Sequence, residues 1–155
     1  PEHAFEAVVE RDGREFRFSP GGPVSDSRGA VWTVHGDPAA LDAELTATTF
    51  QSHAYPDALS RLWSALTSPH AGDILVSAAS GYEFVDWGGV THVGGGSHGA
   101  LSREESLSPL VFVGCGPPDV TSFPQWSLRD IAPVVLGHFG VPLASPSPSL
   151  VGSQR

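Results

Sequence analysis

The chain has 155 residues and a formal net charge of −9, because 17 acidic residues stand against 8 basic ones. The basic residues are all arginines spread along the chain, which excludes the Lys/Arg cluster that a nucleic-acid surface needs. No apolar run is long enough to cross a bilayer, and the length suits about one domain.

The N-terminal third of the chain favours strands and tight turns. Residues 5–18 hold two apolar runs separated by Asp12-Gly13, a pair that tolerates the positive φ of a two-residue hairpin turn. The Ser-, Pro- and Gly-rich residues 19–29 predict a loop, and residues 30–35 (AVWTVH) predict a short strand. A small antiparallel β-hairpin is therefore expected at the N-terminus.

Two helices are predicted next. Asp37 before Pro38 combines an N-cap side chain with a proline in the first turn, and predicts a short helix that frays into residues 46–53. A clearer helix is expected over residues 55–68, where apolar residues recur at intervals of three and four. These residues are Ala58, Leu59, Leu62, Trp63 and Leu66.

Buried strands are predicted in the remainder. Residues 72–79 (GDILVSAA) predict a buried strand, and residues 81–89 predict a weaker one. Residues 108–116 (SPLVFVGCG) form a continuous apolar run, which is typical of a strand covered on both faces. Together with the helices, these strands indicate an α/β fold.

A last helix is expected over residues 126–141. Ser127 and Asp130 have the spacing of a capping box, and Gly140 is a stop. Pro133 lies inside this segment and predicts a kink or a late start of the helix.

The loop at residues 94–99 (GGGSHG) allows more than one chemistry. Glycines let a backbone approach a ligand closely, but a phosphate loop ending in Gly-Lys-Ser/Thr is excluded because the chain has no lysine. The loop also fits the Gly-x-Ser-x-Gly pattern of a nucleophile elbow, with Ser97 as nucleophile. The segment that follows is short and polar rather than a periodic helix, which disfavours a serine esterase.

Metal binding is the stronger hypothesis for this part of the chain. Carboxylate and imidazole groups suit zinc and similar divalent ions, and four such residues lie near one another in the sequence: Asp73, Asp86, His92 and His98. No two of them have a fixed ligand spacing such as His-x-x-x-His. Turn or surface roles therefore explain each residue as well, and no complete metal cage is evident.

The order of motifs resembles a known family. The stretches GGGSHGALSREESLSPLVFVGCGP and WSLRDIAPVVLGHFGVP resemble the C-terminal part of the alkaline phosphatase superfamily, and in particular its type I phosphodiesterase/nucleotide pyrophosphatase branch. In that family a Gly-x-His-Gly loop precedes an acidic turn, then a Pro–apolar strand–Gly-x-Gly run, then a helix with a Leu-x-Asp-Ile-Ala-Pro-like sequence. The resemblance covers roughly residues 55–142.

The resemblance implies a metal-dependent phosphoric ester hydrolase with a two-metal site, usually of zinc, and a phosphoester small molecule as substrate. The expected fold is a partial alkaline-phosphatase-like sheet with flanking helices. His98 takes the place of the family's loop histidine, a metal ligand. No other ligand carries over from the resemblance. In this interpretation Gly94, Gly95, Gly96 and Gly99 would shape the loop that presents His98. Ser97, His92 and Asp86 are candidates for hydrogen bonds that support the ligands, and surface positions explain His92 and Asp86 as well.

Several parts of the family's site have no counterpart here, namely the nucleophile, the N-terminal metal-binding aspartate and the Asp-His-Gly motif. Together with Pro1 as first residue and the lack of methionine, this leads us to expect a C-terminal fragment that is inactive by itself. Residues 1–54 would be a cap-like or intervening β-rich segment, residues 55–142 part of the phosphodiesterase-like domain, and residues 143–155 a disordered tail. The lysine-free composition suggests a bacterial, high-GC source.

The alternative is a non-catalytic binding or self-associating module derived from the same fold. Half of a sheet leaves an open edge and an uncovered apolar face, which recruit a partner. The expected partner is the missing N-terminal half of the fold or, in a homo-oligomer, a second copy of the chain.

Overall fold

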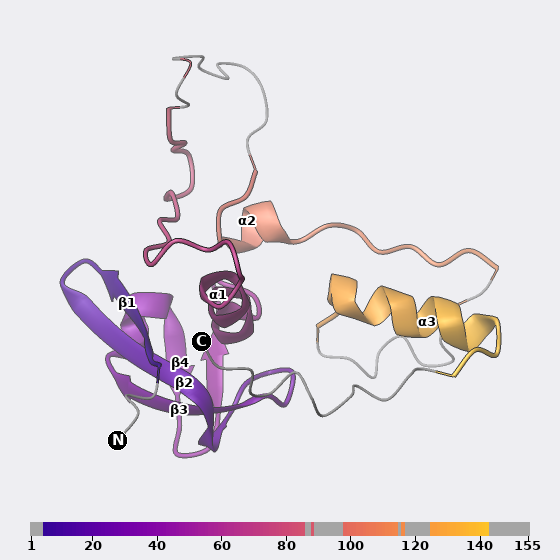
Figure 1. The fold of residues 1–155 in the computed structure, drawn as a ribbon, viewed down its shortest axis with the longest axis horizontal. Coiled ribbons are helices and arrows are strands. Elements are labelled where there is room, and N and C mark those ends of the chain that lie inside the picture. The colour runs from indigo at the N-terminus through magenta and orange to yellow at the C-terminus, as the bar shows by residue number, and fades with distance from the viewer. Residues whose placement is uncertain (1–4, 86–87, 89–97, 115, 117–124, 143–155) are drawn as a thin grey trace. The chain divides into compact units, whose positions relative to one another are not determined.

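The computed structural model describes residues 5–85, 88, 98–114, 116 and 125–142. The chain divides into two compact units, Pro1–Ser108 and Pro109–Arg155, and each is considered by itself. The first contains β1 (Ala7–Arg11), β2 (Arg14–Ser25), β3 (Val31–Gly36), the 3-10 helix η1 (Pro38–Leu41), β4 (Ala43–Leu45), β5 (Phe50–Ser52), α1 (Ala58–Leu66) and α2 (Arg103–Ser106) (Figure 1). The second contains η2 (Leu128–Asp130) and α3 (Ile131–His138).

The predicted N-terminal hairpin is confirmed. β1 and β2 pair antiparallel from Ala7 opposite Phe18 to Arg11 opposite Arg14. Asp12 and Gly13 connect them with φ of 53° and 74°, the two positive values that a type I′ turn requires. The right-handed twist of this turn matches the twist of the two strands, so the turn fixes their register.

The predicted loop over residues 19–29 is wrong in its first half, because β2 continues to Ser25 and pairs with β3. The register shifts between Pro20 and Val24, where the strand bulges. Gly22 lies in this bulge at a φ of 121°, and an added Cβ would lie 2.7 Å from the carbonyl oxygen of Trp32. A strand interrupted by a bulge therefore replaces an open loop.

The helix predicted from Asp37 is a single 3-10 turn. The Asp37 side chain accepts a hydrogen bond from the Ala39 amide, as an N-cap residue should. Asp42 then takes a left-handed conformation, with φ of 45°, and ends the turn. β4 and β5, which the sequence did not predict, form an antiparallel ladder immediately after it.

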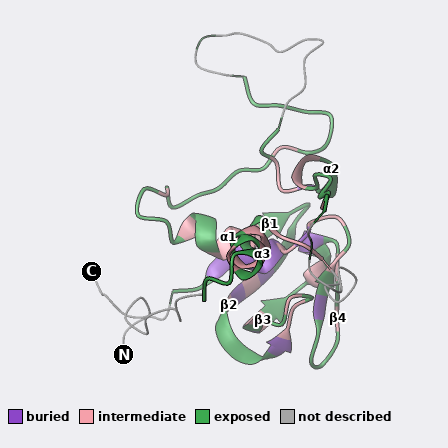
Figure 2. Cartoon of the chain, turned by 90° about the vertical axis from the view of Figure 1, so that its right-hand side faces the viewer, coloured by how far each residue is buried: buried purple, intermediate pink, exposed green. Residues whose placement is uncertain are grey.

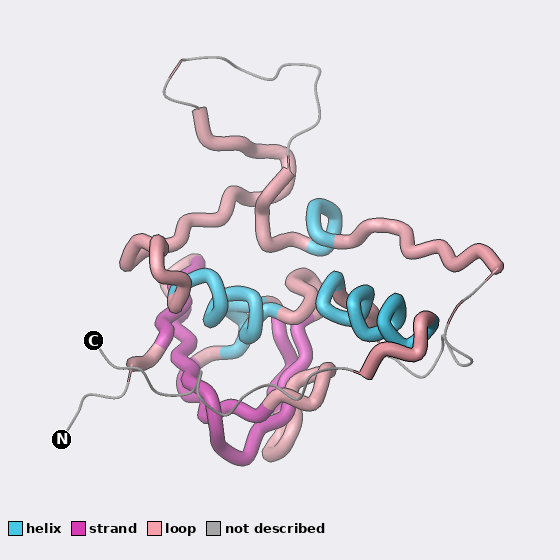
Figure 3. Tube along the Cα trace, turned by 45° about the vertical axis from the view of Figure 1, so that its right-hand side comes forward, coloured by secondary structure: helices cyan, strands magenta, loops and turns pink. Residues whose placement is uncertain are grey.

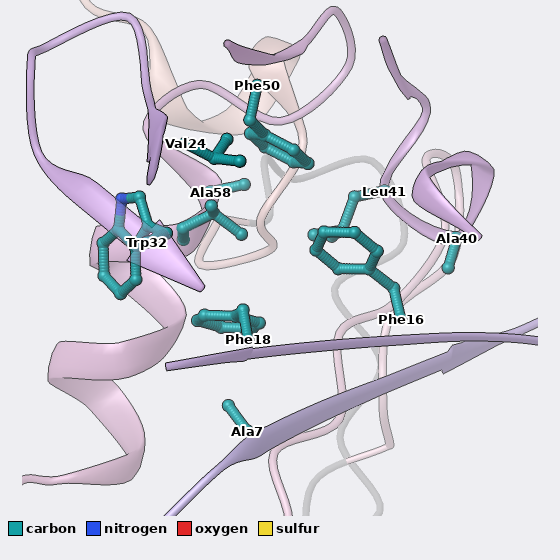
Figure 4. Close-up of a cluster of buried hydrophobic side chains, with 10 residues drawn as sticks. Ala7, Phe16, Phe18, Val24, Trp32, Ala40, Leu41, Phe50 and Ala58 are labelled. Carbon is teal, nitrogen blue, oxygen red and sulfur yellow. The ribbon is translucent and has the colours of Figure 1, made fainter. Parts of the chain in front are cut away.

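The core of the first unit lies between the three-stranded sheet, η1, β5 and α1. Phe16 and Phe18 of β2 are fully buried, and Trp32 of β3 packs edge-on to Phe18 with ring centroids 5.6 Å apart (Figure 4). The predicted helix over residues 55–68 is present as α1, and it buries Ala58 and Leu59 in the same cluster. Helix α1 thus packs with the N-terminal sheet, and this compact unit continues past residue 54.

The strands predicted over residues 72–79, 81–89 and 108–116 do not form in the residues that the structure describes, which are loop there (Figure 3). Their apolar side chains are exposed; Val76 and Val113, for example, are 70% and 84% accessible. A strand apolar on both faces needs hydrogen-bonded neighbours and a layer on each side. The described residues supply neither to these segments, and the predicted partial sheet is not seen among them. Both sheets that the structure does describe are antiparallel.

The second unit has a helix but no buried residue among its described positions (Figure 2). Ser127 and Asp130 form the predicted capping box, in which the Ser127 amide donates to Asp130 Oδ2 at 2.7 Å. Pro133 falls in the first turn of α3, where a proline is tolerated, so the late start is confirmed. Within the described ranges, no helix is long and apolar enough to cross a membrane.

Candidate metal-ligand loop

His98 and Gly99 are the described residues of the glycine-rich loop. The His98 side chain is exposed, and Gly99 takes a φ of 109°, which L-residues rarely adopt. A Cβ at Gly99 would meet no atom within 4 Å, so the backbone conformation rather than crowding favours glycine there. Because the His98 side chain is exposed, its imidazole is open to a ligand from outside.

The chain directly after His98 folds back on itself. The Ala100 amide donates to Glu105 Oε2 at 3.0 Å, and Ser106 Oγ donates to the Leu101 carbonyl at 3.1 Å. Ser102 and Glu105 have the spacing of a capping box, yet the Ser102 side chain makes no capping hydrogen bond. Glu105 accepts instead from the amide of Ala100, two residues before the N-cap Ser102. Residues 100–106, here called the loop foot, are consequently a closed turn ending in α2.

The loop foot is also joined to the chain before the loop. The Leu101 amide donates to Ser77 Oγ at 3.0 Å, a bond between residues 24 positions apart. This one hydrogen bond thus joins the residues on either side of the segment 78–100. His98 lies three residues before that bond.

A second set of contacts fixes the loop foot to α1 and the segment that precedes it. The Arg103 amide donates to the Ala54 carbonyl at 2.7 Å, and Arg103 Nε donates to the His53 carbonyl at 3.2 Å. Arg61 Nη1 donates to the Leu101 carbonyl at 3.0 Å. The Leu101 side chain packs against the hydrophobic core.

Arg61 is half-buried on α1, and burial lowers the pKa of its guanidinium, an effect that the charge of Asp57 opposes. Sequence patterns do not indicate roles for Arg61, Ser77 and Arg103, because their partners are main-chain groups or lie far away in the sequence. One cue was present: Arg61 is the single charged residue between Ala58 and Leu66 of α1.

Most of the predicted site residues cannot be placed. Asp86, His92, Gly94, Gly95, Gly96 and Ser97 lie outside the described residues. Asp73 is described and exposed. Across the described ranges, no three His, Cys, Asp or Glu side chains come together in a group that could hold a metal ion.

Comparisons with known proteins found no matching family model, no matching curated protein and no matching solved structure. Evidence on function consequently comes from the residues of this chain and from the described positions from His98 onward.

Proposed function

We propose that this chain is the C-terminal part of a metal-dependent phosphoric ester hydrolase of the phosphodiesterase/nucleotide pyrophosphatase type. His98 would supply one ligand of its two-metal site. The observation that carries the proposal is the Gly-x-His-Gly loop, which presents an exposed histidine two residues before the hydrogen-bonded loop foot. The downstream motifs follow this loop in the order typical of that family.

The chemistry of His98 suits this role. Neutral imidazole is a common zinc ligand, and a two-metal site clamps the attacking and leaving oxygens of a phosphoryl transfer. A catalytic zinc needs about three protein ligands, and one histidine does not hold it tightly. We therefore expect the chain alone to have no hydrolase activity, with the remaining ligands and the nucleophile supplied by the N-terminal half of the fold.

The exposed apolar segments support the need for another part of the fold. Ile74 and Val76 are 81% and 70% accessible, and Val111 and Val113 are 75% and 84% accessible. Burying one such side chain contributes about 1.5–3 kcal/mol relative to leaving it exposed. These segments are the ones that the sequence predicts as buried strands, and strands from the N-terminal half would cover them.

The same exposed residues favour a second candidate function, a non-catalytic module that associates with a copy of itself. Sedimentation velocity distinguishes the two roles of this surface. A monomer that stays monomeric at high concentration contradicts self-association, whereas a dimer disrupted by Val76→Glu supports it.

The test of the hydrolase proposal uses the whole product of the gene, including any coding sequence that precedes Pro1. We expect this sequence to encode a metal-binding Asp, a Thr or Ser nucleophile and an Asp-His-Gly motif. The purified product should hydrolyse bis-p-nitrophenyl phosphate with zinc bound.

His98→Ala in that product should lower activity by at least a hundredfold, since even residues that only support a metal ligand cost about 10–100-fold. It should also remove about one zinc ion per chain, measured by elemental analysis. His35→Ala is the control, because His35 is an exposed residue of β3. A product without these motifs, or a His98→Ala variant with normal zinc content and activity, would overturn the proposal.

A further inference from the structure

Arg61 joins the start of α1 to a segment that lies 40 residues after Arg61 in the sequence. Its Nη1 donates to the Leu101 carbonyl at 3.0 Å and to the Pro56 carbonyl at 3.1 Å. Pro56 lies just before α1, and Leu101 lies in the loop foot. One nitrogen of one side chain thus holds the start of the helix and the end of the His98 loop together.

The two acceptors are main-chain carbonyls, so the contact constrains the backbone directly. A hydrogen bond from a charged donor is stronger than one between neutral groups, and losing it shifts a local equilibrium by about tenfold or more. Half-burial of Arg61 raises the free-energy cost of losing this contact, because a partly desolvated guanidinium has few water molecules with which to replace a lost carbonyl. Opening the contact is therefore costly.

His98 lies close enough to feel this constraint. Three residues of extended chain span at most about 10 Å, which bounds the distance from the Leu101 backbone to that of His98. Other bonds also hold the loop foot: Leu101 to Ser77, Arg103 to His53 and Ala54, and Ser106 to the Leu101 carbonyl. None of them comes from a side chain of α1. Arg61 supplies the charged contact from that helix.

We propose that Arg61 is a positioning residue for His98: its guanidinium fixes the loop foot against α1, and thereby limits where the imidazole can be presented. The consequence for metal binding rests on the proposed function of His98. The contact of Arg61 with the Pro56 and Leu101 carbonyls, here called the clamp, does not rest on that function, because it concerns the order of the loop in this chain.

The test measures backbone order by ¹⁵N relaxation in the 155-residue chain, for the wild type and three variants. Arg61→Ala removes both hydrogen bonds. Arg61→Lys keeps a cation whose three donors are on one nitrogen, so it retains the charge and the number of donors that the two carbonyls need. Arg17→Ala is the control, because Arg17 bonds Glu15 and Glu6 in the sheet instead of the loop.

In Arg61→Ala we expect the order parameters of residues 98–103 to fall toward the flexible range below about 0.6, while β1–β3 stay near about 0.85. Amide exchange at Leu101 and Arg103 should quicken by about tenfold or more. Arg61→Lys should restore much of both, and Arg17→Ala should change neither. Unchanged order at residues 98–101 in Arg61→Ala, or loss of order throughout the sheet, would overturn the clamp.

The two proposals fail separately. If the loop loosens in Arg61→Ala but the His98→Ala variant of the whole gene product keeps its zinc and activity, the role of Arg61 is supported and the proposed ligand role of His98 is contradicted. If zinc binding and activity depend on His98 but Arg61→Ala leaves the order of the loop unchanged, the proposed role of Arg61 alone is contradicted.

Discussion

The Asp26 carboxylate offers a sharp test of how the N-terminal unit is held together. Asp26 Oδ1 accepts hydrogen bonds from the amides of Arg28 at 2.9 Å and Ala30 at 3.0 Å. Its Oδ2 accepts from Trp32 Nε1 at 2.8 Å and, at 3.5 Å, from Ser60 Oγ of α1. One side chain thus joins the turn before β3, the buried Trp32 and the helix.

Replacing Asp26 with Ala removes three short hydrogen bonds to a carboxylate, each worth about 1.5 kcal/mol, so we expect a loss of about 4.5 kcal/mol in the free energy of unfolding. For a unit of this size that lowers Tm by roughly 18–36 °C. Asp26→Asn should cost about 2 kcal/mol, because the amide keeps one acceptor oxygen and turns an NH2 group toward a donor at the other position.

Urea unfolding followed by tryptophan fluorescence measures both variants, since Trp32 and Trp63 belong to this core. Asp73→Asn is the matched control; Asp73 is exposed, and we expect a change within about 0.5 kcal/mol. If Asp26→Asn were as stable as the wild type, acceptance at both oxygens would not be what fixes this turn.

Three further predictions concern the bulge, the second unit and the chemistry. Gly22→Ala should destabilise the protein by more than about 1 kcal/mol, and by more than Gly21→Ala, since a Cβ at Gly22 would meet the neighbouring strand and a Cβ at Gly21 would not; equal denaturation midpoints would contradict this. A chain that ends at Ser108 should keep the unfolding midpoint of the full chain, because every buried residue that the structure describes precedes that point; a markedly lower midpoint would show that the second unit stabilises the first. The chain alone, with zinc, should not turn over bis-p-nitrophenyl phosphate, and turnover that disappears in His98→Ala would refute that expectation.

Local rules predicted the parts of the fold that depend on neighbours in sequence. The Asp12-Gly13 turn, the Asp37 cap and the Ser127–Asp130 capping box each involve residues no more than three positions apart, and each forms as expected. The bulge at Gly22 was missed because it depends on crowding against Trp32 and Thr33 of another strand. Arg61 was missed for the same reason, since the Leu101 carbonyl that it contacts lies 40 residues away.

The predicted strands at residues 72–79 and 108–116 fail for a different physical reason. Runs of apolar β-branched residues favour a covered strand, but a strand forms only when neighbouring backbones satisfy its N–H and C=O groups. Among the described residues, the N-terminal sheet contains β1, β2 and β3 alone, and residues 72–79 do not pair with it. The residues of these two segments are apolar and yet exposed because they suit a protein interior that the described part of the chain does not provide. Anything that completes that interior, whether the other half of a hydrolase or a second copy, must present hydrogen-bonding backbone as well as apolar surface.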